Sequence, residues 1–316
     1  MEPGSDTTER TEILTEAELT AEERKIVRNF SEKLDLTEPQ EVARYGAAAL
    51  NALSGFTEAV LSLTDTAVFG DISVLLSALA AQLKGFEEPD CTPGLPGVWN
   101  RLRGPVGVMK SRYHRLSVCV GGITENLRER RRRLTLAAES ADRLCGRCED
   151  FRKMLTMYLL SGRRGLERVR RSELAKLREA AERTELPTDV QEAKDLTEAC
   201  DTFEKKLASI ERLAACCTQA QPQLRSLLSA ITGLAEALQT SAIDTAARWK
   251  RQIAAGFGAH SAEKLKEANA VFQNAVEATL RLHDTSAGQR DAAAAELSEI
   301  GGELRALLGG LRDAEN

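Results

Sequence analysis

A long heptad pattern of small and apolar residues constrains this chain more than any other feature. It spans residues 134–162 and returns over residues 196–249, with steps that alternate between three and four. Such spacing lines one face of a supercoiled helix, and that face is stable only when partner helices cover it. The first seam consists of Leu134, Ala137, Ala141, Leu144, Cys148, Phe151, Leu155, Tyr158 and Gly162, and the second of Leu196, Cys200, Phe203, Leu207, Ile210, Ala214, Cys217, Gln221, Leu224, Leu228, Ile231, Ala235, Leu238, Ala242, Thr245 and Trp249. The chain is therefore expected to fold as long helices packed on one another.

Composition supports an all-α fold and a cytoplasmic location. Aromatic residues make up 4% of the 316 residues and prolines number 8, as is usual for long helices. No sustained alternating run predicts a strand, and no uncharged apolar stretch is long enough to span a membrane. The N-terminus is acidic and lacks the basic leader of a secreted protein. Seven scattered cysteines, an odd number, favour a reducing compartment over a disulfide framework.

Local signals predict four parts along the chain. Residues 1–16 are polar and unpatterned, and are expected to be a disordered tail. Residues 17–84 are expected to form a small N-terminal helical module of three helices, over 20–34, 37–63 and 66–83. Thr20 and Glu23 form a capping-box pattern, and Thr37 is the expected N-cap before Pro39. Four prolines in residues 85–107 predict a linker, and residues 108–316 are expected to form the long coiled-coil bundle.

The long bundle is expected to be elongated and antiparallel, with about three helices over most of its length. The turn at residues 185–188 should join the two seams. The irregular spacing between Leu166 and Leu177 resembles a stutter, and Pro222 predicts a kink without a break. Ser261 is the expected N-cap of a helix to about residue 283, and a last helix is expected over residues 286–308.

The charges are distributed unevenly along the sequence. The net charge is −5, yet residues 101–183 contain 22 basic and 10 acidic residues, so this segment carries +12 and the remainder −17. The candidate anion- or partner-binding residues in it are Arg130, Arg131, Arg132, Arg133, Arg163 and Arg164. The arginines suit an oxyanion or an acidic partner, but runs of charge on helices are more often solvated faces paired with acidic neighbours. Few aromatic residues lie nearby to stack on bases, so no nucleic acid is expected.

The residues that carry chemistry in other proteins form no catalytic arrangement here. Cys145 and Cys148 form a C-x-x-C motif, and Cys216 and Cys217 are adjacent, so a thiolate cluster is conceivable. Three of the seven cysteines occupy seam positions, however, where cysteine usually acts as a small buried apolar residue. The three histidines lack metal-ligand spacing, and no phosphate-binding loop motif occurs. We expect a protein that is not an enzyme and has no cofactor and no metal site.

Several segments together resemble the toxic anion resistance family (TelA/KlaA, tellurite resistance). They cover residues 36–46 (LTEPQEVARYG), 155–162 (LTMYLLSG), 203–207 (FEKKL), 219–224 (QAQPQL), 238–242 (LQTSA) and 249–252 (WKRQ). The family-motif residues matched in this way are Tyr158, Gly162, Gln219, Pro222, Gln223, Trp249 and Lys250. The family's proline before the Trp-Lys pair is replaced by Ala246-Ala247-Arg248, and its Thr-Asn pair remains only as Ala268-Asn269.

The resemblance implies a part in resistance to tellurite and other toxic anions and in the response to envelope stress. It brings no catalytic residue. We expect a coiled-coil interaction or scaffold protein with protein partners in a stress resistance system. The alternative is direct handling of the oxyanion, by the arginines or by the thiols. Peripheral association with the membrane and assembly of several copies are both left open by the sequence.

Overall fold

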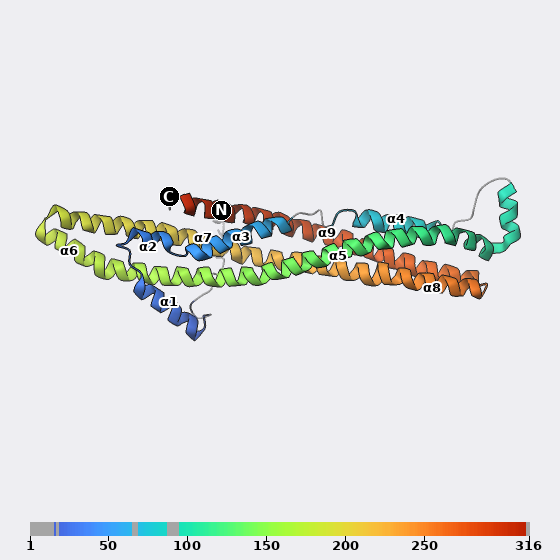
Figure 1. The fold of residues 1–316 in the computed structure, drawn as a ribbon, viewed down its shortest axis with the longest axis horizontal. Helices are drawn as coiled ribbons and strands as arrows, with labels where there is room; N and C mark the ends of the chain where they lie inside the picture. Colours follow the sequence, from blue (N-terminus) through green and yellow to red (C-terminus); the bar gives the residue numbers. More distant parts are fainter. Residues whose placement is uncertain (1–15, 17–18, 65–68, 87–94, 314–316) are drawn as a thin grey trace, which may run out of the picture. The chain divides into compact units, whose positions relative to one another are not determined.

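The computed structural model describes residue 16 and residues 19–64, 69–86 and 95–313, with side chains from residue 106 onward in the last range. Every regular element in these ranges is a helix and none is a strand, which confirms the all-α prediction. The elements in Figure 1 are α1 (Ala21–Lys33), α2 (Pro39–Arg44), α3 (Ala47–Leu63), α4 (Ile72–Lys84), α5 (Leu95–Val169), η3 (Arg170–Leu174), α6 (Ala175–Thr184), α7 (Pro187–Ala237), η4 (Leu238–Ile243), α8 (Asp244–Gly258) and α9 (Ala262–Asp313). The expected tail, residues 1–16, lies outside the described residues except for Glu16.

The chain divides into two compact units. The first unit contains residues 1–64, 143–224 and 295–316, and the second contains residues 65–142 and 225–294. The N-terminal helices α1, α2 and α3 therefore belong to the same unit as the C-terminal part of α5, the N-terminal part of α7 and the C-terminal end of α9. Helix α5 begins at Leu95, so the second half of the expected linker is helical. Pro96 lies in the first turn of that helix, where proline is tolerated because no backbone donor is lost.

The N-terminal helices begin and end on local signals, one of which the sequence prediction missed. Thr20 caps α1, with Glu23 N donating to Thr20 Oγ1 at 3.3 Å and Thr20 N to a Glu23 carboxylate oxygen at 2.8 Å, so the capping box is confirmed. The N-cap of α2 is Glu38, so the prediction of Thr37 was wrong by one residue. The single helix expected after it is divided by Gly46, whose φ of 75° suits glycine.

In the first unit, α5 and α7 run antiparallel as the two arms of a hairpin. Cys148 contacts Cys217, Arg163 contacts Glu211 and Arg170 contacts Glu204. Residue numbers on α7 therefore fall as those on α5 and η3 rise. The arms meet at the expected turn, where Glu185 adopts a left-handed conformation with a φ of 51°. Most apolar seam residues are buried, which confirms the heptad prediction.

Two π-helical turns interrupt the α-helices. The turn η3 covers Arg170–Leu174, where the seam steps from Val169 to Leu174, so the irregular spacing is accommodated by a π turn. The turn η4 at Leu238–Ile243 was not expected. Helix α7 continues through Pro222, which confirms that this proline does not end the helix.

Cationic side chains of the hairpin hold the C-terminal ends of α1 and α2. Lys206 is buried and its Nζ donates to the carbonyl oxygens of Val42 at 3.0 Å and Ala43 at 2.6 Å. Arg168 donates to the carbonyl oxygen of Leu34 at 2.5 Å. The last carbonyls of a helix have no partner within it, and cations there also match the helix dipole. These bonds fix where the short helices sit on the hairpin of the first unit.

The second unit has its own core around Trp249, whose exposed fraction is 0%. The indole ring packs on Tyr113 of α5 and Phe272 of α9, with ring centroids 5.5 Å and 5.8 Å away. Ser261 caps α9 as expected, since Lys264 N donates to Ser261 Oγ at 3.3 Å.

The two C-terminal helices expected from the sequence are in fact one. Helix α9 runs from Ala262 to Asp313 without a break. The hydroxyls of Thr285 and Ser286 donate to carbonyl oxygens three and four residues earlier, on Leu282, Arg281 and His283. Their polar groups are therefore satisfied within the helix, and they do not end it.

Candidate functional site

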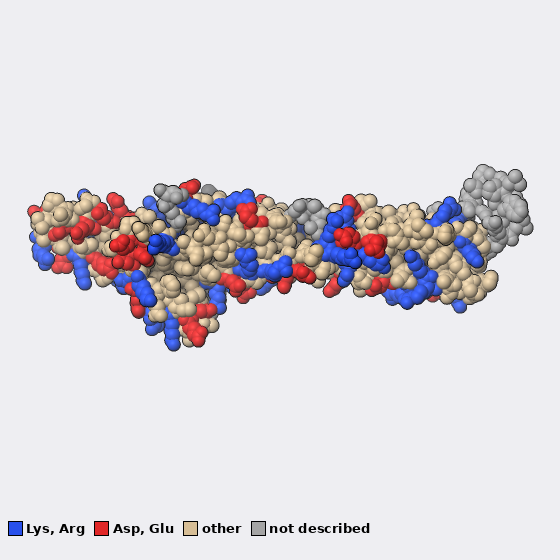
Figure 2. All heavy atoms as spheres, in the orientation of Figure 1, with Lys and Arg blue, Asp and Glu red and all other residues tan. Residues whose placement is uncertain are grey.

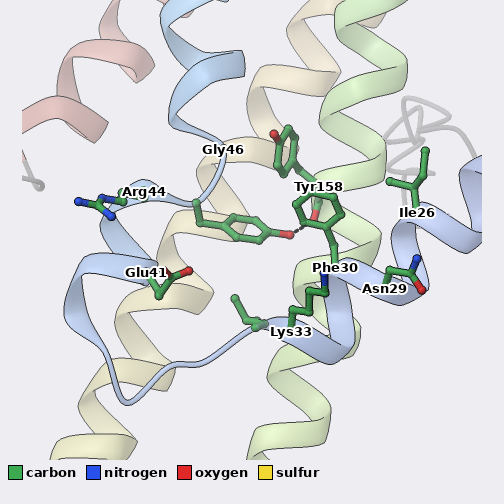
Figure 3. A pocket seen from close by; sticks show the side chains of 10 residues that line it. Ile26, Asn29, Phe30, Lys33, Glu41, Arg44, Gly46 and Tyr158 are labelled. Carbon is green, nitrogen blue, oxygen red and sulfur yellow. Dashed lines mark hydrogen bonds between the residues drawn. The ribbon is translucent and has the colours of Figure 1, made fainter.

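A surface pocket of about 460 Å³ lies in the first unit, between α1, the junction of α2 and α3, and α5. A second hollow of about 130 Å³ shares Ile26, Phe30 and Tyr158 with it, so the two form one depression, here named the α1 groove. The groove is lined by Ile26, Val27, Asn29, Phe30, Lys33, Leu34, Glu41, Arg44, Tyr45, Gly46, Met154, Met157, Tyr158 and Ser161. In Figure 3, Ile26 and Asn29 of α1 lie on one side of Tyr158, and Glu41 and Arg44 of α2 lie on the other.

Helix α1 creates the groove because it carries two apolar stripes. One stripe, which includes Val27, is buried within the unit. The other consists of Ile26 and Phe30, four residues apart and so on one face, with exposed fractions of 44% and 53%. Neighbouring Met154 of α5 is also exposed. Large apolar side chains gathered in an open depression, and not scattered singly, are typical of a contact surface.

Tyr45 closes the inner end of the groove. Its hydroxyl donates to the carbonyl oxygen of Tyr158 at 2.6 Å and lies 2.6 Å from Ser161 Oγ. Its ring packs edge-on against Tyr158 and Phe203, with centroids 5.5 Å and 4.9 Å away. Burial raises the pKa of Tyr45 to about 12, so the hydroxyl stays protonated at neutral pH. This tyrosine acts as an anchor between helices and not as an acid or base.

Gly162 allows the close approach that Tyr45 needs. A Cβ atom at this position would lie 2.5 Å from Leu207 Cδ2 and 3.1 Å from the Tyr45 hydroxyl. The resemblance had singled out Tyr158 and Gly162, and the structure brings both of them to Tyr45. The role of Tyr45 itself was missed, because the sequence predicted one continuous helix over residues 37–63 with Tyr45 in its interior.

The rim of the groove is charged. Lys33 comes from the last turn of α1, and Glu41 and Arg44 come from α2. Within the described part of the chain, none of the three has an ion pair. The rim therefore presents two cations and one carboxylate around an apolar floor. The sequence offered one signal for this site, the second apolar stripe of α1, which was interpreted only as part of a capped helix.

The remaining family-motif residues lie elsewhere. Gln219 and Pro222 are exposed on α7, and Gln223 is half-buried there. Trp249 is fully buried in the second unit, with no acceptor for its Nε1 among the described residues. Lys250 is exposed, and its Nζ lies 3.6 Å from where a Cβ of Gly121 would be.

Comparison with known proteins gives a family match over most of the chain. The family described as "Toxic anion resistance protein (TelA)" matches residues 27–261. The chain belongs to this toxic anion resistance (TelA) family. The matched residues of this TelA-family chain include Phe30, Tyr45 and Trp249. The expectation drawn from the six motif segments is confirmed.

Curated relatives share modest identity with this TelA-family chain. A TelA-like protein of Staphylococcus epidermidis is 24% identical over 243 residues, which cover 76% of this chain and 65% of the relative. An uncharacterized protein of Listeria monocytogenes is 24% identical over 240 residues, 75% of this chain and 60% of its own length. A TelA-like protein of Staphylococcus aureus is 22% identical over 240 residues, with 75% and 64% covered. The chain thus spans less than two thirds of these relatives, and no solved structure matches it.

The candidate arginines of this TelA-family chain are mostly paired with its own acidic residues. In the second unit, Arg130 bonds Asp71 at 2.6 Å, while Arg132 and Arg133 lie 3.9 Å and 3.2 Å from Glu129. In the first unit, Arg163 bonds Glu211 at 2.6 Å and Arg164 bonds Glu16. Arg131 is half-buried, and its Nε has no hydrogen-bond partner among the described residues. On the face drawn in Figure 2, basic and acidic side chains are intermingled.

Four of the six cysteines among the described residues are buried. Cys148 Sγ donates to the carbonyl oxygen of Cys217 at 3.1 Å. Contact with Cys148, followed by burial, raises the pKa of Cys217 above its usual range. Burial and then Glu303 raise the pKa of Cys216 to about 12. Cys145 is half-buried. Among the described residues, no group of three or more His, Cys, Asp or Glu side chains is arranged to hold a metal ion.

Proposed function

We propose that this chain acts in toxic anion resistance as a non-enzymatic, cytoplasmic interaction protein that receives a protein partner in the α1 groove. The observation that carries the proposal is the exposed apolar floor of Ile26, Phe30 and Met154 on a firmly anchored set of helices. Leaving such side chains open to water costs roughly 25 cal/mol per Å² of apolar surface, which a partner would recover.

The surroundings of the groove fit binding better than catalysis. The ionisable residues that line it are Lys33, Glu41, Arg44 and two tyrosines. The Tyr45 hydroxyl is held by Tyr158 and Ser161, and its raised pKa of about 12 removes it from proton transfer near neutral pH. None of the described helices is both long and apolar enough to cross a membrane.

Two observations weigh against direct handling of the oxyanion. Five of the six candidate arginines are engaged by carboxylates of the chain, so an anion would have to compete with these ion pairs. The Cys216 and Cys217 thiols have raised pKa values, and the thiolate is the form that attacks or ligates.

The proposal is tested by tellurite tolerance in a strain that lacks its own copy of the gene. The chain and its Phe30→Ser variant are expressed at equal levels, with Val118→Ser as the control. Val118 is 66% exposed on α5 in the second unit and does not line the groove, so this control removes a comparable exposed apolar side chain. Loss of tolerance with Phe30→Ser alone supports the proposal.

Full tolerance with Phe30→Ser would count against a role for the groove. Calorimetry with tellurite on the purified chain addresses the alternative. Stoichiometric heat of binding that disappears in an Arg131→Gln or a Cys145→Ala, Cys148→Ala variant would favour direct handling instead.

A further inference from the structure

We propose that the occupant of the α1 groove is an acidic amphipathic helix of a partner protein. This inference rests on the proposed function, because it names the partner surface for the same site. Three features of the described residues support it: the helical walls of the groove, the charge of its rim and the charge of α1 itself.

The walls of the groove suit a helix. Ile26 and Phe30 lie one helical turn apart on α1, and Met154, Met157 and Tyr158 repeat at similar spacing on α5. Two helices with such stripes leave a groove into which the side-chain ridge of a third helix packs. No strand edge occurs within the described ranges, so an added β-strand has nothing to pair with there. The two methionines add flexible, polarizable surface that adapts to a partner's side chains.

The rim of the groove favours acidic residues in the partner. Lys33 and Arg44 come from different helices and have no ion pair within the described ranges, whereas Arg163 of the same unit bonds Glu211 at 2.6 Å. Glu41 is the single carboxylate in the lining. A helix with carboxylates flanking its apolar stripe would reach both cations. Such rim pairs mainly set the choice and orientation of the partner.

Charge also argues against symmetric pairing of the groove with the same groove of a second copy. In a two-fold symmetric dimer built on this groove, the surface that a second copy offers is the exposed stripe of its own α1. That helix holds four basic and three acidic residues, and one of the acidic ones, Glu23, is already bonded to Lys153 at 2.6 Å. The second copy would therefore bring Lys25, Arg28 and Lys33 toward a rim that is itself net positive.

The test uses a pair of synthetic peptides and the full chain. Each peptide has about 18 residues, a length at which a helix can form, with leucines at i, i+3, i+4 and i+7. One peptide carries glutamates beside the leucines, and the other carries lysines at the same places. Binding is followed by fluorescence anisotropy of a label at the peptide N-terminus, at two salt concentrations.

The chain is expected to bind the glutamate peptide about tenfold more tightly than the lysine peptide, with a smaller difference at high salt. Phe30→Ser should weaken glutamate-peptide binding by about tenfold, as expected for an apolar anchor, while the Val118→Ser control leaves it unchanged. The double variant Lys33→Glu, Arg44→Glu should reverse the preference. Circular dichroism confirms that these surface variants keep their helix content.

Three results would overturn the proposal. The first is equal or tighter binding of the lysine peptide. The second is self-association of the chain in sedimentation velocity that Phe30→Ser abolishes, which would identify a second copy as the occupant. The third is binding to phosphatidylglycerol vesicles, but not to the glutamate peptide, that depends on Phe30.

The peptide test and the tolerance test can fail separately. If the glutamate peptide does not bind while Phe30→Ser still abolishes tellurite tolerance, the groove has a different occupant and the proposed function stands. If the peptide binds as expected while Phe30→Ser retains full tolerance, the site is assigned correctly and the proposed function is wrong.

Discussion

The Nζ atom of Lys206 lies 2.6 Å from the carbonyl oxygen of Ala43, although the two residues are 163 positions apart in the sequence. This bond, with the one to Val42 at 3.0 Å, joins α7 to the end of α2. It also fixes the backbone directly before Tyr45, on which the inner end of the α1 groove depends.

Lys206→Met should destabilise the first unit by about 2–4 kcal/mol. The substitution keeps most of the apolar side chain but removes a charged donor from one buried and one half-buried helix-end carbonyl. The measurement is the urea midpoint followed by circular dichroism. Lys205→Met is the matched control, because Lys205 is exposed on the neighbouring position and should shift the midpoint little. Equal shifts in the two variants would show that Lys206 does not cap α2.

Gly162→Ala should destabilise the first unit by roughly 1–3 kcal/mol, because the new methyl group overpacks the contact with Leu207 and the Tyr45 hydroxyl. Gly146 lies on the same helix, and a methyl group added there would have nothing within 4 Å, so Gly146→Ala should stabilise by up to about 1 kcal/mol through helix propensity. Thermal unfolding should give a lower melting temperature for Gly162→Ala and a higher one for Gly146→Ala. Stabilisation by both would mean that α5 shifts freely at Gly162.

Tyr45 should make stability depend on pH in the alkaline range. Its pKa is about 12 when folded and about 10 when exposed, so the unfolded chain loses this proton first. The contribution of the buried, protonated hydroxyl to the free energy of unfolding is complete below pH 10. It is lost as pH rises toward 12, by up to about 3 kcal/mol. Tyr45→Phe removes this dependence. The measurement is the difference in unfolding free energy between the two proteins from pH 8 to pH 11, and a constant difference would contradict a buried hydroxyl.

The sequence was most informative where the signals are local. The Thr20–Glu23 box and the Ser261 cap depend on a few adjacent residues, and both are confirmed. Periodicity was misleading at Gly46, because the apolar spacing continues across the break that its positive φ introduces. The boundary signals that predicted a break between residues 283 and 286 were also misleading, because the Thr285 hydroxyl bonds back into α9. Residue type alone does not show whether a helix is interrupted at such a position or continues through it.

The candidate site was harder to predict because it depends on contacts between distant segments. Tyr158 and Gly162 were found through the family motifs. The groove, in contrast, depends on contacts between distant segments, among them the bonds by which Arg168 and Lys206 hold the ends of α1 and α2 against the hairpin. No periodic pattern encodes these side-chain to carbonyl bonds. The exposed stripe of Ile26 and Phe30 lines a groove only when α1 packs beside α5.

Trp249 should tolerate loss of its indole nitrogen better than loss of its volume. The ring is fully buried against Tyr113 and Phe272, while Nε1 has no acceptor among the described residues. Trp249→Ala should cost about 3–5 kcal/mol through the cavity it leaves, and Trp249→Phe clearly less. Chemical unfolding of both variants gives the comparison. An equal loss in Trp249→Phe would indicate that the nitrogen holds an ordered water molecule.

The thiols should react in an order set by burial. The measurement uses a Cys91→Ser variant, which leaves six cysteines. Of these, Cys119 is exposed and Cys145 half-buried, whereas Cys148, Cys200, Cys216 and Cys217 are buried. The raised pKa values of Cys200, Cys216 and Cys217 further reduce the thiolate that attacks a disulfide reagent. With Ellman's reagent at pH 8, one or two thiols should react within the mixing time, and the other four only as the chain unfolds. Rapid reaction of all six in the folded protein would instead show thiols open to solvent, and would revive the idea that they reduce the oxyanion directly.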